Sequence, residues 1–209
     1  IAFVFGGDGT ILSASRKLNG KQIPLIGVHL GKFGFLAELT SQEISDSLEK
    51  IFTGKYTVSQ RMLLSCKIIR SKKIINKTLG LNDAVISRTS LSRLISIKLY
   101  VNEKTVATYS SDGLIVSTPA GSTAHSLSAG GPIVTPDMEA FIITPICPHT
   151  LSNRPLVVSG DSKIEMEQIS ESKGVGLTVD GQIYFDVKVG DRIVIEKAEK
   201  KLQLIDIQT

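Results

Sequence analysis

The sequence has no tryptophan, only two cysteines, and an aromatic content of 5% in 209 residues. Aromatic side chains supply the stacking surfaces of single-stranded nucleic-acid sites, so their scarcity argues against a nucleic-acid partner. Cys66 and Cys147 lie far apart without metal-binding spacing, which favours a reduced, cytoplasmic protein. No stretch approaches the roughly 20 apolar residues that cross a bilayer, so the sequence excludes a membrane-spanning protein and gives no sign of a membrane partner.

The overall composition is that of a folded globular protein. Hydrophobic residues make up 42% and charged residues 21%, and the net charge is +4. A chain of this length forms one large domain or two small ones. Its basic residues are scattered apart from short clusters such as Lys72-Lys73 and Lys197 to Lys201. We interpret these clusters as solvated faces, the alternative being that some lysines help to hold a phosphorylated ligand.

Residues 1–57 alternate strand and helix signals. IAFVF at 1–5 is a continuous apolar run, which is typical of a strand covered on both faces. Helical spacing of apolar residues follows from Thr10 to Leu18, and IPLIGVHL at 23–30 reads as a second strand. Thr40 with Glu43 resembles a helix start. This β-α-β-α order predicts a Rossmann-like α/β domain with a parallel, doubly wound sheet.

Period-two patterns dominate residues 58–194 and predict a β-rich second domain. Alternating runs include TVSQRMLLSCKII, which begins at Thr57, and LISIKLYVN, and turn signals such as Asp180-Gly181 separate them. A helix is expected only after Pro119 to Ser122. We expect residues 195–209 to return to the first domain, so the predicted fold class is α/β plus all-β.

GGDGT at 6–10 joins the first strand to the first helix. Glycines let the backbone approach a bulky anion closely, and a helix N-terminus adds partial positive charge, so this turn suits a phosphate. Asp8 would repel a phosphate unless it holds Mg²⁺, accepts a hydroxyl proton, or does both. The alternative is an ordinary strand-to-helix turn in which Asp8 caps the next helix.

A second dense region is SDGLIVSTPAGSTAHSLSAGGPI at 111–133. Its small residues leave little side-chain bulk, so a flat ligand can lie against the backbone. The hydroxyls of Ser122, Thr123, Ser126 and Ser128 are candidate donors to such a ligand. A flexible serine-rich loop is the alternative.

Four segments together resemble the NAD kinase family over nearly the whole chain and in the right order. They are GGDGT at 6–10, LNDAVIS at 81–87, DGLIVSTPAGSTAHSLSAGGPI at 112–133 and VDGQ at 179–182. GGDGT alone is shared with diacylglycerol and sphingosine kinases, whereas the TPAGSTAHSLSAGG stretch is specific. The resemblance implies transfer of a phosphoryl group from ATP, or polyphosphate in some members, to the 2'-hydroxyl of the adenosine ribose of NAD, giving NADP. It further implies Mg²⁺ or another divalent cation with ATP, and a homodimer or homotetramer.

The resemblance also assigns residues. Asp8 matches the proposed base that faces the 2'-hydroxyl, and no residue is assigned as a metal ligand. The remaining residues expected at the ligands are Gly7, Gly9 and Thr10 on the phosphoryl path, Phe35 at the border of the site, Asn82 and Asp83 at the adenosine, Thr123, Ala124, His125 and Ser128 around the adenine, and Asp112, Asp180 and Gln182 near the ligand.

Several features depart from the family pattern. Asp83 is one methylene shorter than the usual Glu, His125 stands where Tyr is usual, and His29 replaces the common Asn. The strand-helix-strand leader that normally precedes GGDGT is missing, so we expect a fragment, with a reduced α/β sheet as the alternative. Two other functions stay open: a dinucleotide-binding sensor without turnover, and a lipid kinase that shares the GGDGT loop.

Overall fold

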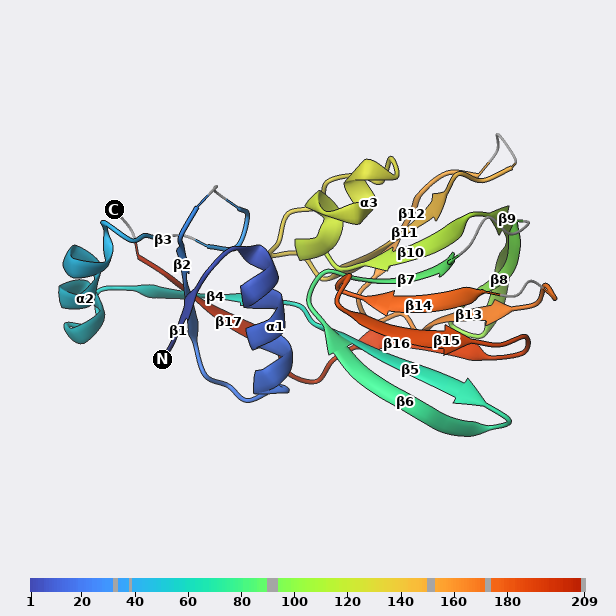
Figure 1. Cartoon of the computed structure of the whole chain (residues 1–209), viewed down its shortest axis with the longest axis horizontal. Helices are drawn as coiled ribbons and strands as arrows, with labels where there is room; N and C mark the ends of the chain where they lie inside the picture. The colour runs from blue at the N-terminus through green and yellow to red at the C-terminus, as the bar shows by residue number, and fades with distance from the viewer. Residues whose placement is uncertain (32–33, 38, 90–93, 150–152, 172–173, 208–209) are drawn as a thin grey trace. The chain divides into compact units, whose positions relative to one another are not determined.

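The computed structural model describes residues 1–31, 34–37, 39–89, 94–149, 153–171 and 174–207 (Figure 1). The chain forms two compact units. Unit 1 comprises residues 1–61 and 199–209, and unit 2 comprises residues 62–198. None of the helices in the described residues is long and apolar enough to cross a membrane.

Unit 1 is an α/β fold, as the sequence predicts. Its elements are β1 (Ala2–Phe5), α1 (Asp8–Leu18), β2 (Leu25–His29), β3 (Leu39–Thr40), α2 (Ile44–Phe52), β4 (Thr57–Arg61) and β17 (Leu202–Asp206). The sheet has the order β1-β2-β17-β4, with β3 also beside β2. Strands β1, β3 and β17 run parallel to β2, while β4 runs antiparallel to β17.

The central strand β2 is buried along its whole length because helices cover both faces of the sheet (Figure 1). Ile51 of α2 packs with Ile26 and Val28 on one face. On the other face Gly27 lies so close to Ile11 of α1 that a Cβ there would sit 2.6 Å from the Ile11 Cδ1 atom. Alternate residues of a strand point to opposite faces, so a continuous apolar run is what such a strand needs.

Unit 2 is a sandwich of two antiparallel sheets, so the predicted β-rich domain is confirmed. One sheet has the order β12-β11-β10-β7-β14-β15 and the other β6-β5-β16-β13-β8-β9. The elements are β5 (Leu64–Arg70), β6 (Lys73–Gly80), β7 (Asp83–Arg88), β8 (Ile95–Val101), β9 (Lys104–Ser111), β10 (Gly113–Ser117), the 3₁₀ helix η1 (Ala120–Thr123), α3 (His125–Ser128), β11 (Ala140–Ile146), β12 (Leu156–Ser159), β13 (Ile164–Gln168), β14 (Val175–Val179), β15 (Ile183–Val187) and β16 (Arg192–Lys197).

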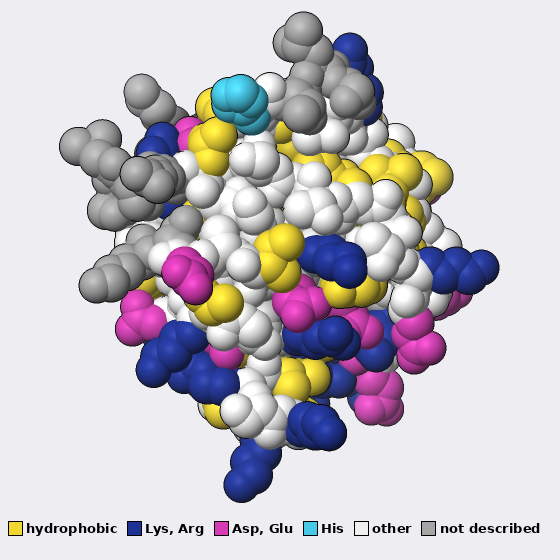
Figure 2. Space-filling model, turned by 90° about the vertical axis from the view of Figure 1, so that its right-hand side faces the viewer, with side chains coloured by type: hydrophobic (Ala, Val, Ile, Leu, Met, Phe, Trp, Pro, Cys, Tyr) yellow, Lys and Arg dark blue, Asp and Glu magenta, His cyan; other side chains and the backbone are white. Residues whose placement is uncertain are grey.

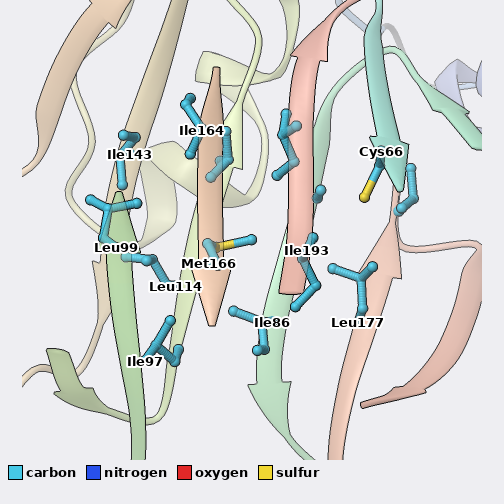
Figure 3. Packing of buried hydrophobic residues seen from close by; sticks show 14 of the residues in the cluster. Cys66, Ile86, Ile97, Leu99, Leu114, Ile143, Ile164, Met166, Leu177 and Ile193 are labelled. Atoms are coloured by element: carbon cyan, nitrogen blue, oxygen red, sulfur yellow. The ribbon is translucent and has the colours of Figure 1, made fainter. Parts of the chain in front are cut away.

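The core of unit 2 lies between the two sheets. Every second residue of the central strands points inward, and Leu99 and Met166 of one sheet face Ile86 and Leu177 of the other (Figure 3). Burial of a side chain of this size contributes roughly 1.5–3 kcal/mol. Strand β10 differs from the strands that bury every second residue, since all of its residues, Gly113–Ser117, are buried. The helices α3 and η1 pack against this strand.

The single alternating run expected from Thr57 onward is wrong. It is divided into β4 and β5, which belong to different units. Met62 and Leu63 between these strands are both buried. Two consecutive buried residues break the period-two pattern, and they mark the place where the chain passes from one unit to the other.

Charged side chains of both signs lie interspersed, mainly over the lower half of the face of the molecule that Figure 2 shows. A nucleic-acid-binding face is typically a continuous basic patch. This face therefore has the character of a solvated protein surface.

Candidate functional site

The GGDG turn brings Asp8 into the first turn of α1. Strand β1 ends at Phe5 and the helix begins at Asp8, two residues before the predicted start at Thr10. Gly6 has φ +148°, a value that favours glycine, and a Cβ there would lie 2.3 Å from the Thr10 Oγ1 atom. Gly7, Gly9 and Thr10 are all exposed, as a surface that receives an anion requires.

The Asp8 carboxylate is held by backbone amides from a distant segment. The Phe35 N–H donates to Oδ2 at 2.9 Å, and the Leu36 N–H donates to Oδ1 at 3.1 Å. The N-cap of α1 is Gly7, and no side-chain hydrogen bond caps the helix. The capping interpretation of Asp8 is therefore wrong. Each carboxylate oxygen keeps acceptor capacity beyond the one amide that it binds.

Phe35 contacts Asp8 through its backbone, and the expectation that its ring borders the site stays a prediction. Its side chain is 77% exposed, and the contact that it makes with Asp8 comes from its backbone N–H. Gly34 is a residue that the sequence reasoning missed. A Cβ on Gly34 would lie 2.2 Å from Asp8 Oδ1 and 2.6 Å from Oδ2, so only glycine permits this close approach.

Replacing Gly34 with alanine is expected to displace the Asp8 carboxylate while the sheet of unit 1 stays intact. A displacement near 1 Å at a reacting group lowers a rate by about tenfold to 10²-fold. Gly31→Ala is the matched control, because a Cβ there meets no atom of the described residues within 4 Å. Steady-state kinetics of both variants, with thermal unfolding, check this. Equal activity of the two variants would show that the Gly34 contact does not set the position of Asp8.

In unit 2 a single carboxylate organises the segment that contains Asn82 and Asp83. Asp180 occupies the tight turn between β14 and β15 with φ +53°, and its carboxylate accepts hydrogen bonds from three consecutive backbone amides. The Oδ1 atom lies 3.0 Å from the Leu81 nitrogen, 2.8 Å from that of Asn82 and 3.3 Å from that of Asp83. The fold therefore uses Asp180, a predicted ligand-binding residue, to shape this loop.

The TPAG segment packs directly on the same loop. Thr118 donates its backbone N–H to the Asn82 carbonyl at 2.9 Å and its hydroxyl to the Leu81 carbonyl. A Cβ on Gly121 would lie 2.1 Å from the Asn82 carbonyl oxygen. Thr118 and Gly121 are thus further residues on which the site depends, and sequence reasoning assigned neither a role.

Asn82 presents a buried polar atom without a partner in the described residues, and the adjacent Asp83 is a buried acid. The Asn82 Oδ1 atom is buried and receives no hydrogen bond from the described residues. The Asp83 side chain is 4% exposed, and within the described part of the chain its carboxyl makes neither a hydrogen bond nor an ion pair. Burial and, secondly, the neighbouring Asp180 carboxylate raise the pKa of Asp83 to about 7. Polar groups buried without partners are costly, so they are typical of a ligand-binding site.

The hydroxyls of the serine-rich segment fall into two groups. Ser122 is buried and bonds to the Pro119 carbonyl and to Val134, while Ser126 is buried and bonds to Thr144. Their assignment as ligand donors is wrong, because the fold uses both hydroxyls. The segment residues that remain accessible are Thr123 and Ala124, which are half-buried, and His125 and Ser128, which are exposed.

Asp112 does not lie beside Asp83 within this chain. Strand β10 pairs antiparallel with β7, so that Ser117 is opposite Asp83 and Gly113 is opposite Ser87. Asp112 therefore lies at the far end of β7, where it forms a 2.9 Å ion pair with Arg88. Gln182 is exposed next to the Asp180 turn. The ligand-binding roles of Asp112 and Gln182 stay predictions.

The described residues contain no group of three or more His, Cys, Asp or Glu side chains that could hold a metal ion. Mg²⁺ differs from Zn²⁺ in that it commonly binds through one or two carboxylates together with substrate phosphates. The single carboxylate of Asp8 beside a helix N-terminus fits that mode.

Comparison with known proteins gives matches over both units. Residues 1–56 match the family model of the ATP-NAD kinase N-terminal domain, and residues 81–207 match that of the ATP-NAD kinase C-terminal domain. The NAD kinase of Geobacter metallireducens is 46% identical over 205 residues, which cover 98% of this chain and 72% of the relative.

Two solved structures are similar. The yeast NADH kinase complexed with NADH has a TM-score of 0.92 and 31% identity, over 99% of this chain and 61% of that one. The Archaeoglobus fulgidus NAD kinase in complex with ATP has a TM-score of 0.83 and 32% identity, over 97% of this chain and 76% of that one.

Proposed function

This chain belongs to the NAD kinase family, and we propose that it transfers the terminal phosphoryl group of ATP to the 2'-hydroxyl of the adenosine ribose of NAD, giving NADP. The observation that carries this proposal is the Asp8 carboxylate, which two backbone amides hold in the GGDG turn. In unit 2 the buried Asn82 Oδ1 atom, which has no partner among the described residues, and the buried Asp83 carboxyl support dinucleotide binding.

Asp8 orients the acceptor hydroxyl and takes up its proton. The ribose 2'-oxygen forms a bond to the γ-phosphorus, the bond between that phosphorus and the β-γ bridging oxygen breaks, and ADP leaves with the electron pair. The hydroxyl proton passes to an Asp8 carboxylate oxygen. Because the transition state of phosphoryl transfer is loose, the proton can leave late, and fixed orientation by the Phe35 and Leu36 amides matters more than basicity.

Unit 2 binds the adenosine part of the dinucleotide. The Asn82 Oδ1 atom accepts a hydrogen bond from a ligand donor, which its lack of a partner in the described residues supports. The half-buried Thr123 and Ala124 and the exposed Ser128 surround the adenine. The exposed ring of His125 stacks on the ligand in place of the tyrosine usual in the family.

Mg²⁺ is proposed to enter with the phosphates of ATP, and Asp8 is the residue of unit 1 that would hold it. When bound, Mg²⁺ neutralises phosphate charge as it develops. The exposed backbone of Gly7 and Gly9 lines the path of the phosphoryl group, where the N-terminus of α1 favours negative charge.

A product assay tests the proposed function. The full chain is incubated with Mg²⁺, an acceptor and a donor, and NADP is quantified with an NADP-specific dehydrogenase. Acceptors are NAD, NADH and diacylglycerol, and donors are ATP and polyphosphate. We expect phosphorylation of the dinucleotide with ATP. Binding of NAD by calorimetry without product would favour the sensor, and phosphorylated diacylglycerol would favour the lipid kinase.

We further propose a cytoplasmic homodimer or homotetramer that has neither nucleic acid nor membrane as a partner. Free Cys66 and Cys147 are compatible with a reducing compartment. The interspersed charges of the face in Figure 2 are compatible with the absence of a nucleic-acid partner.

A further inference from the structure

Asp83 is a buried acid to which no cation of the described residues is paired. It is the first residue of β7, and elements on each side of it are packed against it. Strand β10 places Ser117 opposite Asp83, and the turn after β14 places the Asp180 N–H on the Asp83 carbonyl at 2.9 Å. The 3₁₀ helix η1 places Gly121 against the adjacent Asn82 backbone. Of these neighbours only Asp180 titrates, and it is an acid.

An ionised Asp83 would place a second negative charge beside Asp180. The three loop amides already donate to Asp180, and no described side chain supplies a cation to Asp83. The diphosphate of an incoming dinucleotide would add further negative charge. A buried charge without a partner is strongly unfavourable, and such a group takes up a proton instead.

Resting on the proposed function, we propose that Asp83 binds the adenosine ribose as a neutral carboxylic acid, whose O–H donates to one ribose oxygen while its carbonyl accepts from a ribose hydroxyl. Burial and the neighbouring Asp180 carboxylate both favour this neutral state. Dinucleotide binding then selects the protonated enzyme.

The proposal predicts how dinucleotide binding depends on pH. The pKa of Asp83 is raised to about 7 in the folded chain, so its protonated fraction falls as pH rises through neutrality. The apparent dissociation constant equals the dissociation constant of the protonated protein divided by the fraction of protein in which Asp83 is protonated. That fraction falls about tenfold between pH 6 and pH 8, so the apparent dissociation constant should rise about tenfold.

The test measures NADH binding by nucleotide fluorescence, with the full chain and without ATP, at both pH values. We expect the wild type to bind about tenfold more weakly at pH 8. Asp83→Asn is neutral at every pH and has the shape of the protonated acid, so it should bind at both pH values as the wild type does at pH 6. Asp161→Asn is the matched control, because Asp161 is 79% exposed, and it should follow the wild type.

Two results would overturn the inference: a wild-type dissociation constant that is equal at pH 6 and pH 8, or loss of NADH binding by Asp83→Asn at both values while its thermal unfolding is unchanged. NADP formation is assayed separately at one pH. If NADP forms but NADH binding does not depend on pH, this inference is refuted and the proposed function stands. If NADH binding depends on pH but no NADP forms, the proposed kinase activity is refuted and the binding of NADH by neutral Asp83 is supported.

Discussion

Asp8→Asn should lower kcat for NADP formation by about 10²–10⁴-fold, the range that general acid–base groups contribute. Asparagine keeps the shape of the side chain but cannot take up the hydroxyl proton. Its amide nitrogen would also face one of the two N–H donors of Phe35 and Leu36, so the hydrogen bonds that position the group would be reduced to one. Steady-state kinetics with saturating NAD and ATP measure the effect.

The control for this variant is Asp46→Asn. Asp46 lies in the first turn of α2, as Asp8 lies in the first turn of α1, and it is exposed. The same chemical change in the first turn of the other long helix of unit 1 should leave kcat near the wild-type value. Asp8→Asn with wild-type kcat and an unchanged unfolding curve would remove Asp8 from the proton transfer.

Gly121→Ala should destabilise unit 2 by about 1–3 kcal/mol or more, the usual cost of forcing a methyl group into packed structure. The added Cβ would lie 2.1 Å from the Asn82 oxygen, 2.5 Å from its carbonyl carbon and 2.7 Å from its Cα. All three atoms belong to the backbone, so no side-chain rotation relieves the clash. The loop that carries Asn82 and Asp83 has to move, and NADH affinity should fall with it.

Urea unfolding and NADH fluorescence titration measure the two effects of Gly121→Ala. Gly31→Ala adds the same methyl group in open space and should change neither quantity. Wild-type stability together with wild-type affinity in Gly121→Ala would contradict the close packing of the two segments.

The local parts of the fold were predictable from the sequence because their signals are local. The apolar run at residues 1–5 predicts β1. The pair Thr40 and Glu43 predicts a helix here, although α2 begins at Ile44 with Glu43 as its N-cap, three residues after Thr40. In the structure the Thr40 N–H donates to Glu43 Oε2 at 2.7 Å, and the Glu43 N–H donates to Thr40 Oγ1 at 3.3 Å. A pattern that repeats every two residues fixes which side of a strand is buried, so the core of unit 2 was also accessible.

The supports of the candidate site were not predictable, because each depends on residues far apart in the sequence. Nothing local links Asp8 to the amides of Phe35 and Leu36, and nothing local distinguishes Gly34 or Gly121 from glycines that merely turn the chain. Ser126 resembles a ligand donor in the sequence because its buried partner, Thr144, is also distant. Family resemblance located the sequence segments of the candidate site. The geometry then distinguishes polar groups that are hydrogen-bonded within the fold from those that have no partner among the described residues.

The carboxylate of Asp180 also determines when the 81–83 loop can take up its final shape during synthesis. Its three amide partners precede it by 97 to 99 residues, so the 81–83 loop leaves the ribosome long before the group that shapes it. Contacts of such sequence separation form late because a long segment has to be ordered first. A nascent chain that ends before the β14–β15 hairpin therefore contains the 81–83 loop but lacks the carboxylate that holds its three amides.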